Sequence, residues 1–263
     1  MADTIIRTIY VKRNTGIKPR SNYSDASDTQ TLSALFRYTA EMSTSYRDRI
    51  KRLLTPPERR MFQTLATPQK VQDYLDTLPI NFEASGETYM APRRVLRAKT
   101  AHCFEGALLA AAALAYHGQK PLLLDFRTIP DDEDHVVALF RQNGYWGAIS
   151  KTNHAILRYR EPAYRSPREL AISFFHEYLM WDGRKSLRAY SRPFDLSKFA
   201  PERWVTADKE LFWLVEALDK TRHFPTVPKK NLRTLRKAYK IELRAMKLVE
   251  WKRKKRLPRS RQR

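Results

Sequence analysis

The sequence predicts an α+β fold in which a buried central helix packs on an antiparallel sheet. Residues Phe104–Tyr116 are apolar on nearly every face, which is typical of a helix inside a protein. Three apolar runs with strand character follow, at Pro121–Phe126, His135–Arg141 and Tyr145–Ser150. The pair Asn143-Gly144 favours a tight hairpin, and a hairpin makes neighbouring strands antiparallel.

Composition and length fit one large soluble domain with appendages. The chain has 263 residues, of which 42% are apolar and 30% charged, enough to build a sizeable core. No run reaches the roughly 18 apolar residues of a membrane helix, and the first residues lack the pattern of a secretory signal. A lone cysteine forms no internal disulfide and fits a reducing compartment. We therefore expect a cytoplasmic protein without a transmembrane segment.

Upstream of the core we expect an extended arm followed by helices. Thr4–Val11 has short strand character, and Leu32–Leu54 predicts a helix. The prolines after Thr55 end that helix, because proline lacks an amide donor. Glu58–Leu78 predicts one or two short helices, and Pro92–Lys99 a further short helix that leads to the central one.

Downstream of the core the pattern alternates between helices and irregular segments. We expect a turn at Glu161–Tyr164, an amphipathic helix at Pro167–Trp181, and irregular structure over residues 182–206. Asp208–Leu218 predicts a further helix, and the two prolines of the 220s indicate a linker. The chain thus divides into an N-terminal arm and helix (1–57), a core (58–200), a C-terminal helix and linker (201–228), and a basic tail (229–263).

The formal charge of +22 is concentrated in the tail. Lys229–Arg263 holds sixteen Lys and Arg against two acids, which gives +14 and leaves +8 for the rest of the chain. Apolar residues recur at three- and four-residue steps from Asn231 to Lys255, so we expect one basic amphipathic helix there. Such a tail suits a polyanion, either nucleic acid, whose phosphates it would bind without reading sequence, or an anionic surface.

Cys103 and His135 are the candidate catalytic residues. A cysteine is a nucleophile as its thiolate, and a helix N-terminus favours that anion through its unpaired amides. Cys103 precedes the central helix, and His135 opens a strand from which its ring can project over the helix end. An imidazole placed there can pair with the thiolate and protonate a leaving group. Glu105 opposes this, since a carboxylate in the first turn disfavours a neighbouring thiolate.

These segments resemble the transglutaminase-like superfamily, within the papain-like cysteine fold. The resemblance rests on AHCFEGALLAAAALAYHG, DHVVALF and YWGAIS, and covers roughly Pro68–Tyr178. It implies a papain/transglutaminase-like core, with Cys103 as nucleophile and His135 as base. The chain departs from the family in two places, with Ala101 where the family has glycine and Ser150 where it has an aspartate.

The third catalytic residue is therefore open. Asn153 is the nearest replacement for the aspartate, since an asparagine orients the histidine in papain-like proteases. Asp125, on the neighbouring strand, is another candidate, although an ion pair with Arg127 would also explain it. Asp134 adjoins His135, but successive strand residues face opposite sides, so we expect it to point away.

Two functions follow from this pattern. The first is a cysteine enzyme that forms a thioester with a peptide or other amide substrate, as a hydrolase or an acyltransferase. The second is an inactive form of the same fold that binds nucleic acid or another polyanion through residues 229–263. We expect neither cofactor nor metal, because the chain has no cysteine pair and no glycine-rich phosphate loop, and the acids Asp131–Asp134 fit a solvated loop.

Overall fold

The computed structural model describes residues 45–84 and 86–252. The expected strand Thr4–Val11 and the part of the expected helix Leu32–Leu54 before Ser45 lie outside them. Within the described residues the fold is α+β with an antiparallel sheet, as predicted. No helix in this part of the chain has both the length and the apolar character to cross a bilayer.

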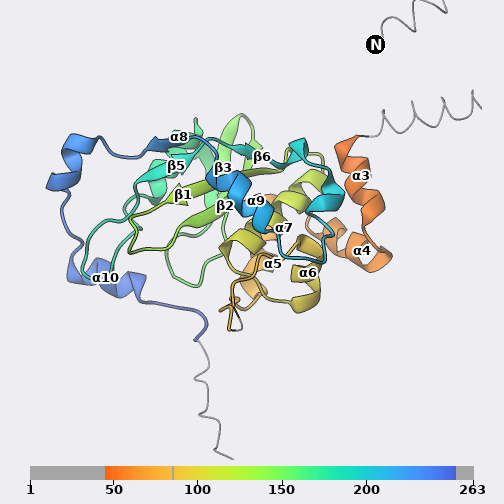
Figure 1. The fold of residues 1–263 in the computed structure, drawn as a ribbon, viewed down its shortest axis with the longest axis horizontal. Helices are drawn as coiled ribbons and strands as arrows, with labels where there is room; N and C mark the ends of the chain where they lie inside the picture. The colour runs from red at the N-terminus through yellow and green to blue at the C-terminus, as the bar shows by residue number, and fades with distance from the viewer. Residues whose placement is uncertain (1–44, 85, 253–263) are drawn as a thin grey trace, which may run out of the picture. The chain divides into compact units, whose positions relative to one another are not determined.

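In the described residues a run of helices precedes the first strand, and further helices and strands are interspersed after it (Figure 1). The α-helices are α3 (Tyr46–Leu53), α4 (Pro56–Thr64), α5 (Pro68–Thr77), α6 (Pro92–Ala98), α7 (Cys103–Tyr116), α8 (Pro167–Phe174), α9 (Phe212–Asp219) and α10 (Lys240–Met246). The strands are β1 (Leu122–Arg127), β2 (His135–Gln142), β3 (Tyr145–Ile149), β4 (Arg160–Tyr164), β5 (Ala189–Ser191), β6 (Phe194–Asp195) and β7 (His223–Pro225). Short 3₁₀ helices occur at η1 (Leu196–Lys198), η2 (Pro201–Arg203) and η3 (Lys229–Thr234).

The sheet is built from antiparallel pairs in the order β4-β3-β2-β1-β5-β7, with β6 paired to β1. The three predicted strands form its centre, and the hairpin between β2 and β3 turns at Asn143 and Gly144 as expected. Their φ angles of 51° and 86° are left-handed, the geometry of the tight turn that matches strand twist. Phe126 pairs with His135, which places the histidine at the start of β2 beside the end of β1.

Apolar side chains on the two faces of the sheet enter two separate clusters. Leu123, Ala138 and Ile149 pack with α7 and the helices α3 to α5, whereas Leu124 and Val137 pack with α8 on the other face. Figure 1 shows α5, α6 and α7 grouped beside β2 and β3. The sheet therefore lies between helices, and α7 is the helix buried deepest.

The sequence of α7 explains its burial. All its residues from Phe104 to Tyr116 are buried, so the helix lies wholly inside the protein as its apolar surface predicts. Gly106 allows a close approach, because a Cβ there would lie 2.5 Å from Cβ of Lys151. The start of α7 thus fits against the residues that follow β3.

Four expectations about local structure were wrong. The expected turn Glu161–Tyr164 belongs to the edge strand β4, where Pro162 is tolerated because an edge amide needs no partner. The helix from Pro167 ends at Phe174 rather than Trp181. Residues 182–206 contain β5 and β6, and the expected linker contributes β7 to the sheet. The strands β4, β5, β6 and β7 gain their structure from pairing with distant strands, which local patterns do not report.

The expected basic helix Asn231–Lys255 was also wrong. It is divided into η3, an irregular stretch, the short helix α10, and a second irregular stretch up to Trp251 that contains one bridge at Val249. Like charges four residues apart, such as Arg233 with Lys237, destabilise a continuous helix. Backbone bonds from Ala238 to Gly183 and from Glu250 to Asn153 also tie the chain to the core in non-helical form.

Candidate active site

Cys103 is the first residue of α7, at the end of the helix where amides lack partners inside the helix. It is partly buried. Burial would raise the pKa of its thiol, but hydrogen bonds and charge from His102 and His135 outweigh burial and lower the pKa to about 5. Both imidazoles therefore favour the thiolate form of Cys103, as does its position at the helix end.

His102 is the N-cap of α7, directly before Cys103. Its Nε2 lies 2.7 Å from the Thr88 carbonyl oxygen, which can only accept, so Nε2 carries the proton and Nδ1 is left for the thiol. Burial lowers the pKa of His102, but the hydrogen bond and charge of Cys103 and the charge of Glu105 raise it to about 9. His102 thus supplies a cation beside the thiolate.

Glu105 is fully buried, and its carboxylate is saturated with donors. It accepts hydrogen bonds from Thr88 Oγ1 at 2.9 Å and from the backbone amides of His102 at 3.0 Å and Met90 at 3.1 Å. Its Oε1 lies 3.5 Å from His102 Nε2. The expected conflict between this carboxylate and the thiolate is therefore relieved by the His102 cation, which contacts both.

His135 is held by Ser150, the residue that replaces the aspartate of the resembled family. His135 Nε2 lies 2.8 Å from Ser150 Oγ, and that hydroxyl donates its only proton to the Leu157 carbonyl at 2.5 Å. Ser150 must then accept from His135 Nε2–H, which leaves Nδ1 as the ring nitrogen for the thiol. A neutral hydroxyl thus fixes the tautomer that a carboxylate would otherwise fix.

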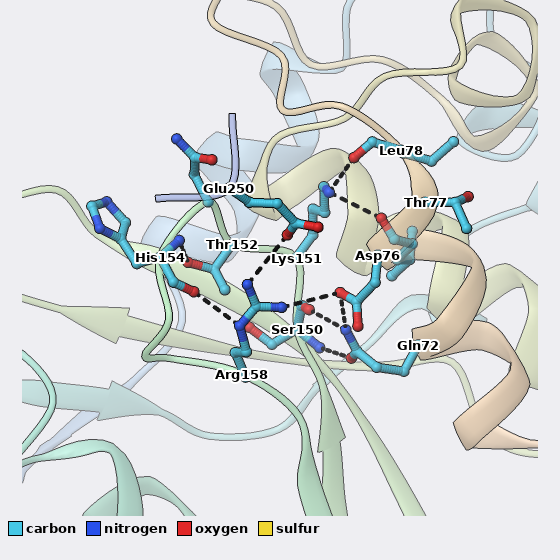
Figure 2. A network of polar contacts seen from close by, with 12 residues as sticks. Gln72, Asp76, Thr77, Leu78, Ser150, Lys151, Thr152, His154, Arg158 and Glu250 are labelled. Atoms are coloured by element: carbon cyan, nitrogen blue, oxygen red, sulfur yellow. Dashed lines mark hydrogen bonds and ion pairs between the residues drawn. The ribbon is translucent and has the colours of Figure 1, made fainter. Parts of the chain in front are cut away.

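The supports of Ser150 come from distant parts of the chain. The Gln72 side chain accepts from Ser150 N and donates to Ser150 O, each at 2.9 Å, as drawn in Figure 2. Leu157 has a left-handed φ of 60°, and its amide donates to Glu177 at 2.6 Å. Arg160 in turn lies 2.6 Å from Glu177. The orientation of His135 therefore rests on α5, β4 and the segment after α8.

Asn153 does not contact His135, and its expected role as the third catalytic residue was wrong. Its Nδ2 donates to the Trp251 carbonyl at 3.0 Å and its Oδ1 accepts from the Trp251 amide at 2.8 Å. Both ends of the amide are thus used on the backbone of the C-terminal segment. Ser150, three residues earlier, is the side chain that reaches the imidazole.

Asp125 and Asp134 are also not the third residue. Asp125 Oδ2 lies 2.8 Å from His223 Nε2, and both side chains are buried. That hydrogen bond joins β1 to β7, and Arg127, the expected partner, donates instead to the Asp219 carbonyl. Asp134 points away from His135 as predicted, and accepts from the amide and hydroxyl of Thr128.

A cavity of about 620 Å³ contains the thiol and both imidazoles. Its lining includes five acids, Glu83, Asp132, Glu133, Asp134 and Glu177, although the chain as a whole is strongly basic. Tyr178 forms part of the wall, and its buried hydroxyl has no partner among the described residues. The cavity is therefore large enough for a small acyl group and carries negative charge around it.

Lys151 anchors the loop that begins after Ser150. It is fully buried, and its Nζ donates to the Leu75 carbonyl at 2.9 Å and to the Leu78 carbonyl, at the C-terminal end of α5 (Figure 2). The same Nζ lies 4.1 Å from the centre of the Trp251 ring. Burial lowers the pKa of Lys151 to about 8. This cation therefore joins α5, the site loop and the C-terminal segment.

No group of three or more His, Cys, Asp or Glu in residues 45–84 and 86–252 is arranged to hold a metal ion. The acids from Asp131 to Asp134 make separate contacts, among them a 3.2 Å pair between Asp131 and Arg184. No family model matches the chain, and no curated protein matches it. The chemistry of the site must therefore be argued from its own residues.

The sequence pointed to Cys103 and His135 but missed His102, Ser150, Gln72 and Glu177. A histidine beside a cysteine at a helix start was a signal that could have been used, because an N-cap residue lies within reach of the first turn. In the sequence, Ser150 stood out only because it lacks the charge of the aspartate in the resembled family. Gln72 and Glu177 carried no signal, since their partners lie 78 and 20 residues away.

Proposed function

We propose that the protein is a transglutaminase-like cysteine enzyme that acts on an amide or related acyl bond through a thioester. The observation that carries this proposal is a thiol with a pKa of about 5 at a helix N-terminus, inside a cavity and beside two imidazoles. The uncharged orientation of His135 by Ser150 supports it. Buried cysteines without a function ordinarily have raised rather than lowered pKa values.

In the first half of the reaction the thiolate of Cys103 attacks the acyl carbonyl carbon and a C–S bond forms. The backbone amide of Cys103 has no backbone partner among the described residues and can donate to the developing oxyanion. As the C–N bond breaks, protonated His135 gives its Nδ1 proton to the departing amine. His102 keeps the thiolate ionised before the attack, but its Nε2–H remains on the Thr88 carbonyl.

In the second half neutral His135 accepts a proton from water or from an amine that attacks the thioester. The C–S bond breaks and the thiolate returns, so the product is an acid or a new amide. The negative charge around the cavity favours substrates that carry a cation near the reacting bond.

The decisive experiment measures the alkylation of Cys103 by iodoacetamide against pH. We expect the rate to rise with a midpoint near 5 in the unchanged protein. His102→Ala and His135→Ala should each raise the midpoint, and the double variant should move it to about 8.5, the value of a free thiol. A midpoint near 8.5 in the unchanged protein would refute the proposal.

A second measurement tests acyl chemistry directly. A p-nitrophenyl ester should acylate Cys103, detected by intact mass, and release nitrophenol beyond one equivalent as the thioester turns over. His135→Ala should accumulate or fail to form the thioester, whereas Cys103→Ala should abolish both signals.

The alternative function is a catalytically inactive fold that binds nucleic acid or another polyanion through the basic tail. The charge of +14 over residues 229–263 favours it, as does α10, in which no residue is buried. An unactivated thiol combined with salt-sensitive binding to a polyanion would favour this alternative over the enzyme.

A further inference from the structure

The C-terminal segment Met246–Trp251 lies beside the loop that leaves the active site. Its residue Val249 forms an antiparallel bridge with His154. On either side, Ala155 N donates to the Leu248 carbonyl at 3.0 Å, and Glu250 N donates to the Asn153 carbonyl at 2.9 Å. The segment therefore forms one antiparallel β-bridge with Asn153–Ala155.

The same loop lines the cavity that contains Cys103. Thr152, Asn153 and His154 belong to the cavity wall, and Met246 of the segment joins them. His154 Nδ1 lies 2.8 Å from the Met246 carbonyl. The segment thus closes one side of the cavity rather than packing elsewhere on the surface.

The segment is held by polar contacts and buries little apolar surface. Leu248 and Val249 remain 62% and 40% exposed, and α10, just before them, has no buried residue. Exposed main-chain bonds with few apolar contacts are typical of regions that open at low free-energy cost. The pairing is therefore one that another extended chain can replace.

We propose that the edge Asn153–Ala155 binds an extended, basic polypeptide substrate, and that Met246–Trp251 is an internal occupant that such a substrate displaces. The ligand is a substrate only if the proposed function holds, so this inference rests on that function. Binding at the edge itself does not depend on catalysis. An extended chain added to an exposed edge gains affinity from main-chain hydrogen bonds, and side-chain contacts then set its specificity.

Two contacts of the present occupant indicate what the edge recognises. The Asn153 amide bonds both the N–H and the C=O of Trp251, so it recognises the main chain of the residue at that position. Lys151 lies beneath the Trp251 ring, which favours an aromatic side chain there.

Charge gives the third requirement. The cavity lining carries acids such as Glu83, Asp132 and Glu133, and the occupant belongs to a strongly basic part of the chain. Opposite charges raise the rate of encounter and disfavour acidic competitors. The expected ligand is therefore an extended peptide that contains lysine or arginine and an aromatic residue.

The test compares two substitutions at one position. Glu250→Pro removes the amide that donates to Asn153 and suits the extended backbone before it, whereas Glu250→Gln keeps the amide and removes only the 3.2 Å pair with Arg158. The measurement is the modification rate of Cys103 by a polyethylene-glycol maleimide divided by the rate with iodoacetamide. This ratio reports access and not thiol activation, so it separates this proposal from the proposed function.

We expect Glu250→Pro to raise the ratio several-fold and Glu250→Gln to leave it unchanged. A synthetic peptide of residues 244–252 should then lower the raised ratio, whereas a peptide of the same composition in scrambled order should not. An unchanged ratio in Glu250→Pro, or equal protection by both peptides, would overturn the proposal.

Hydrogen exchange on the unchanged protein provides a test that needs no variant. The amides of Ala155, Glu250 and Trp251 should exchange much faster than those in the middle of α7, because the segment opens without global unfolding. Exchange as slow as that of α7 would make the segment a fixed wall and overturn the proposal.

Discussion

At the residue scale, the site orients its imidazole without a charged partner. The Ser150 hydroxyl donates its proton to the Leu157 carbonyl and therefore accepts from His135 Nε2–H. It orients the imidazole in this way without the charge of a carboxylate. Charge from both His135 and His102 favours the thiolate, and His102 is held beside buried Glu105.

Removing the Ser150 hydroxyl should slow acylation of Cys103 while leaving the fold intact. We expect Ser150→Ala to lose about five- to tenfold in acylation rate, since one neutral hydrogen bond contributes roughly 1 kcal/mol. Ser186→Ala is the matched control, because Ser186 is also fully buried but its hydroxyl has no partner among the described residues. Ester acylation followed by intact mass measures both, and equal rates in the two variants would contradict the role of Ser150.

The ionised pair should also give stability a defined pH dependence. The pKa of Cys103 in the folded state, about 5, is lower than that of a free thiol, so its contribution is present at high pH and is lost as pH falls through 5. The pKa of His102, about 9, is raised, so its contribution is complete below about 6.5 and is lost as pH rises through 9. The thiolate and the imidazolium therefore both contribute to stability between about pH 5 and pH 9.

Urea unfolding of the unchanged protein and of Cys103→Ser checks this dependence. A serine hydroxyl does not ionise, so the stability lost in the variant should be largest near neutral pH and should shrink below pH 5 and above pH 9. A loss that is constant from pH 4 to pH 10 would show that no thiolate–imidazolium pair forms.

The sequence pointed to Cys103 and His135 as candidates because their positions follow from element boundaries. Cys103 begins the apolar helix and His135 begins a strand, and both boundaries are visible in the pattern of residues. The partner of His135 was not visible, because it depends on the left-handed turn at Leu157 and on its bond to Glu177. Asn153 was proposed as that partner because it is close along the chain, but its side chain is hydrogen-bonded to the backbone of Trp251.

At the element scale, the position of α7 is set by its contact with the residues after β3. Gly106 lies against Lys151, and the amine of Lys151 bonds the carbonyls that end α5. Cations at helix C-termini are favoured by the helix dipole, which compensates part of the cost of burying this one. Helix α5, helix α7 and the site loop are therefore fixed to one another through two residues.

Gly106→Ala tests this junction. Alanine normally stabilises a helix by about 1 kcal/mol relative to glycine, but the added Cβ would overlap Lys151, and overpacking costs about 1–3 kcal/mol. We expect a net loss of stability in thermal unfolding, together with slower alkylation of Cys103 as the helix end shifts. A gain in stability would show that the contact is looser than 2.5 Å implies.

The central elements were predicted well and the peripheral ones were not. The helix from Cys103 and the strands β1 to β3 are long, strongly apolar and linked by short turns, so local pattern decides them. Strands β4, β5 and β7 are short and form at or beyond the edges of that central sheet, where pairing decides. The tail looked helical because periodicity ignores repulsion between like charges and competition from the loop at Asn153.

At the scale of the whole molecule, acidic and basic residues are concentrated in two different regions. Acids gather in the lining of the cavity, while the residues from Lys229 onward carry +14 of the net charge of +22. The tail approaches the cavity through Met246–Trp251 and continues with the cluster Lys252–Arg256. Polyanion binding and access to Cys103 can therefore be tested separately by changing only this cluster.

Neutralising that cluster distinguishes the two functions without disturbing the docked segment. The variant changes Lys252, Arg253, Lys254, Lys255 and Arg256 to glutamine. Its control changes five exposed bases elsewhere to glutamine, Arg47, Arg59, Arg60, Lys70 and Lys99.

If the tail binds phosphates, the variant should reduce the slope of log affinity for single-stranded nucleic acid against log salt by up to about 4, since each lost contact contributes roughly 0.7–0.9. The control should change the slope little, because its charges are dispersed. Alkylation of Cys103 should be equal in both, since the five control bases and Lys252 do not line the cavity. Equal slopes in the two variants would show that the tail is not a dedicated polyanion site, and the cysteine chemistry would then stand as the function that the chain supports.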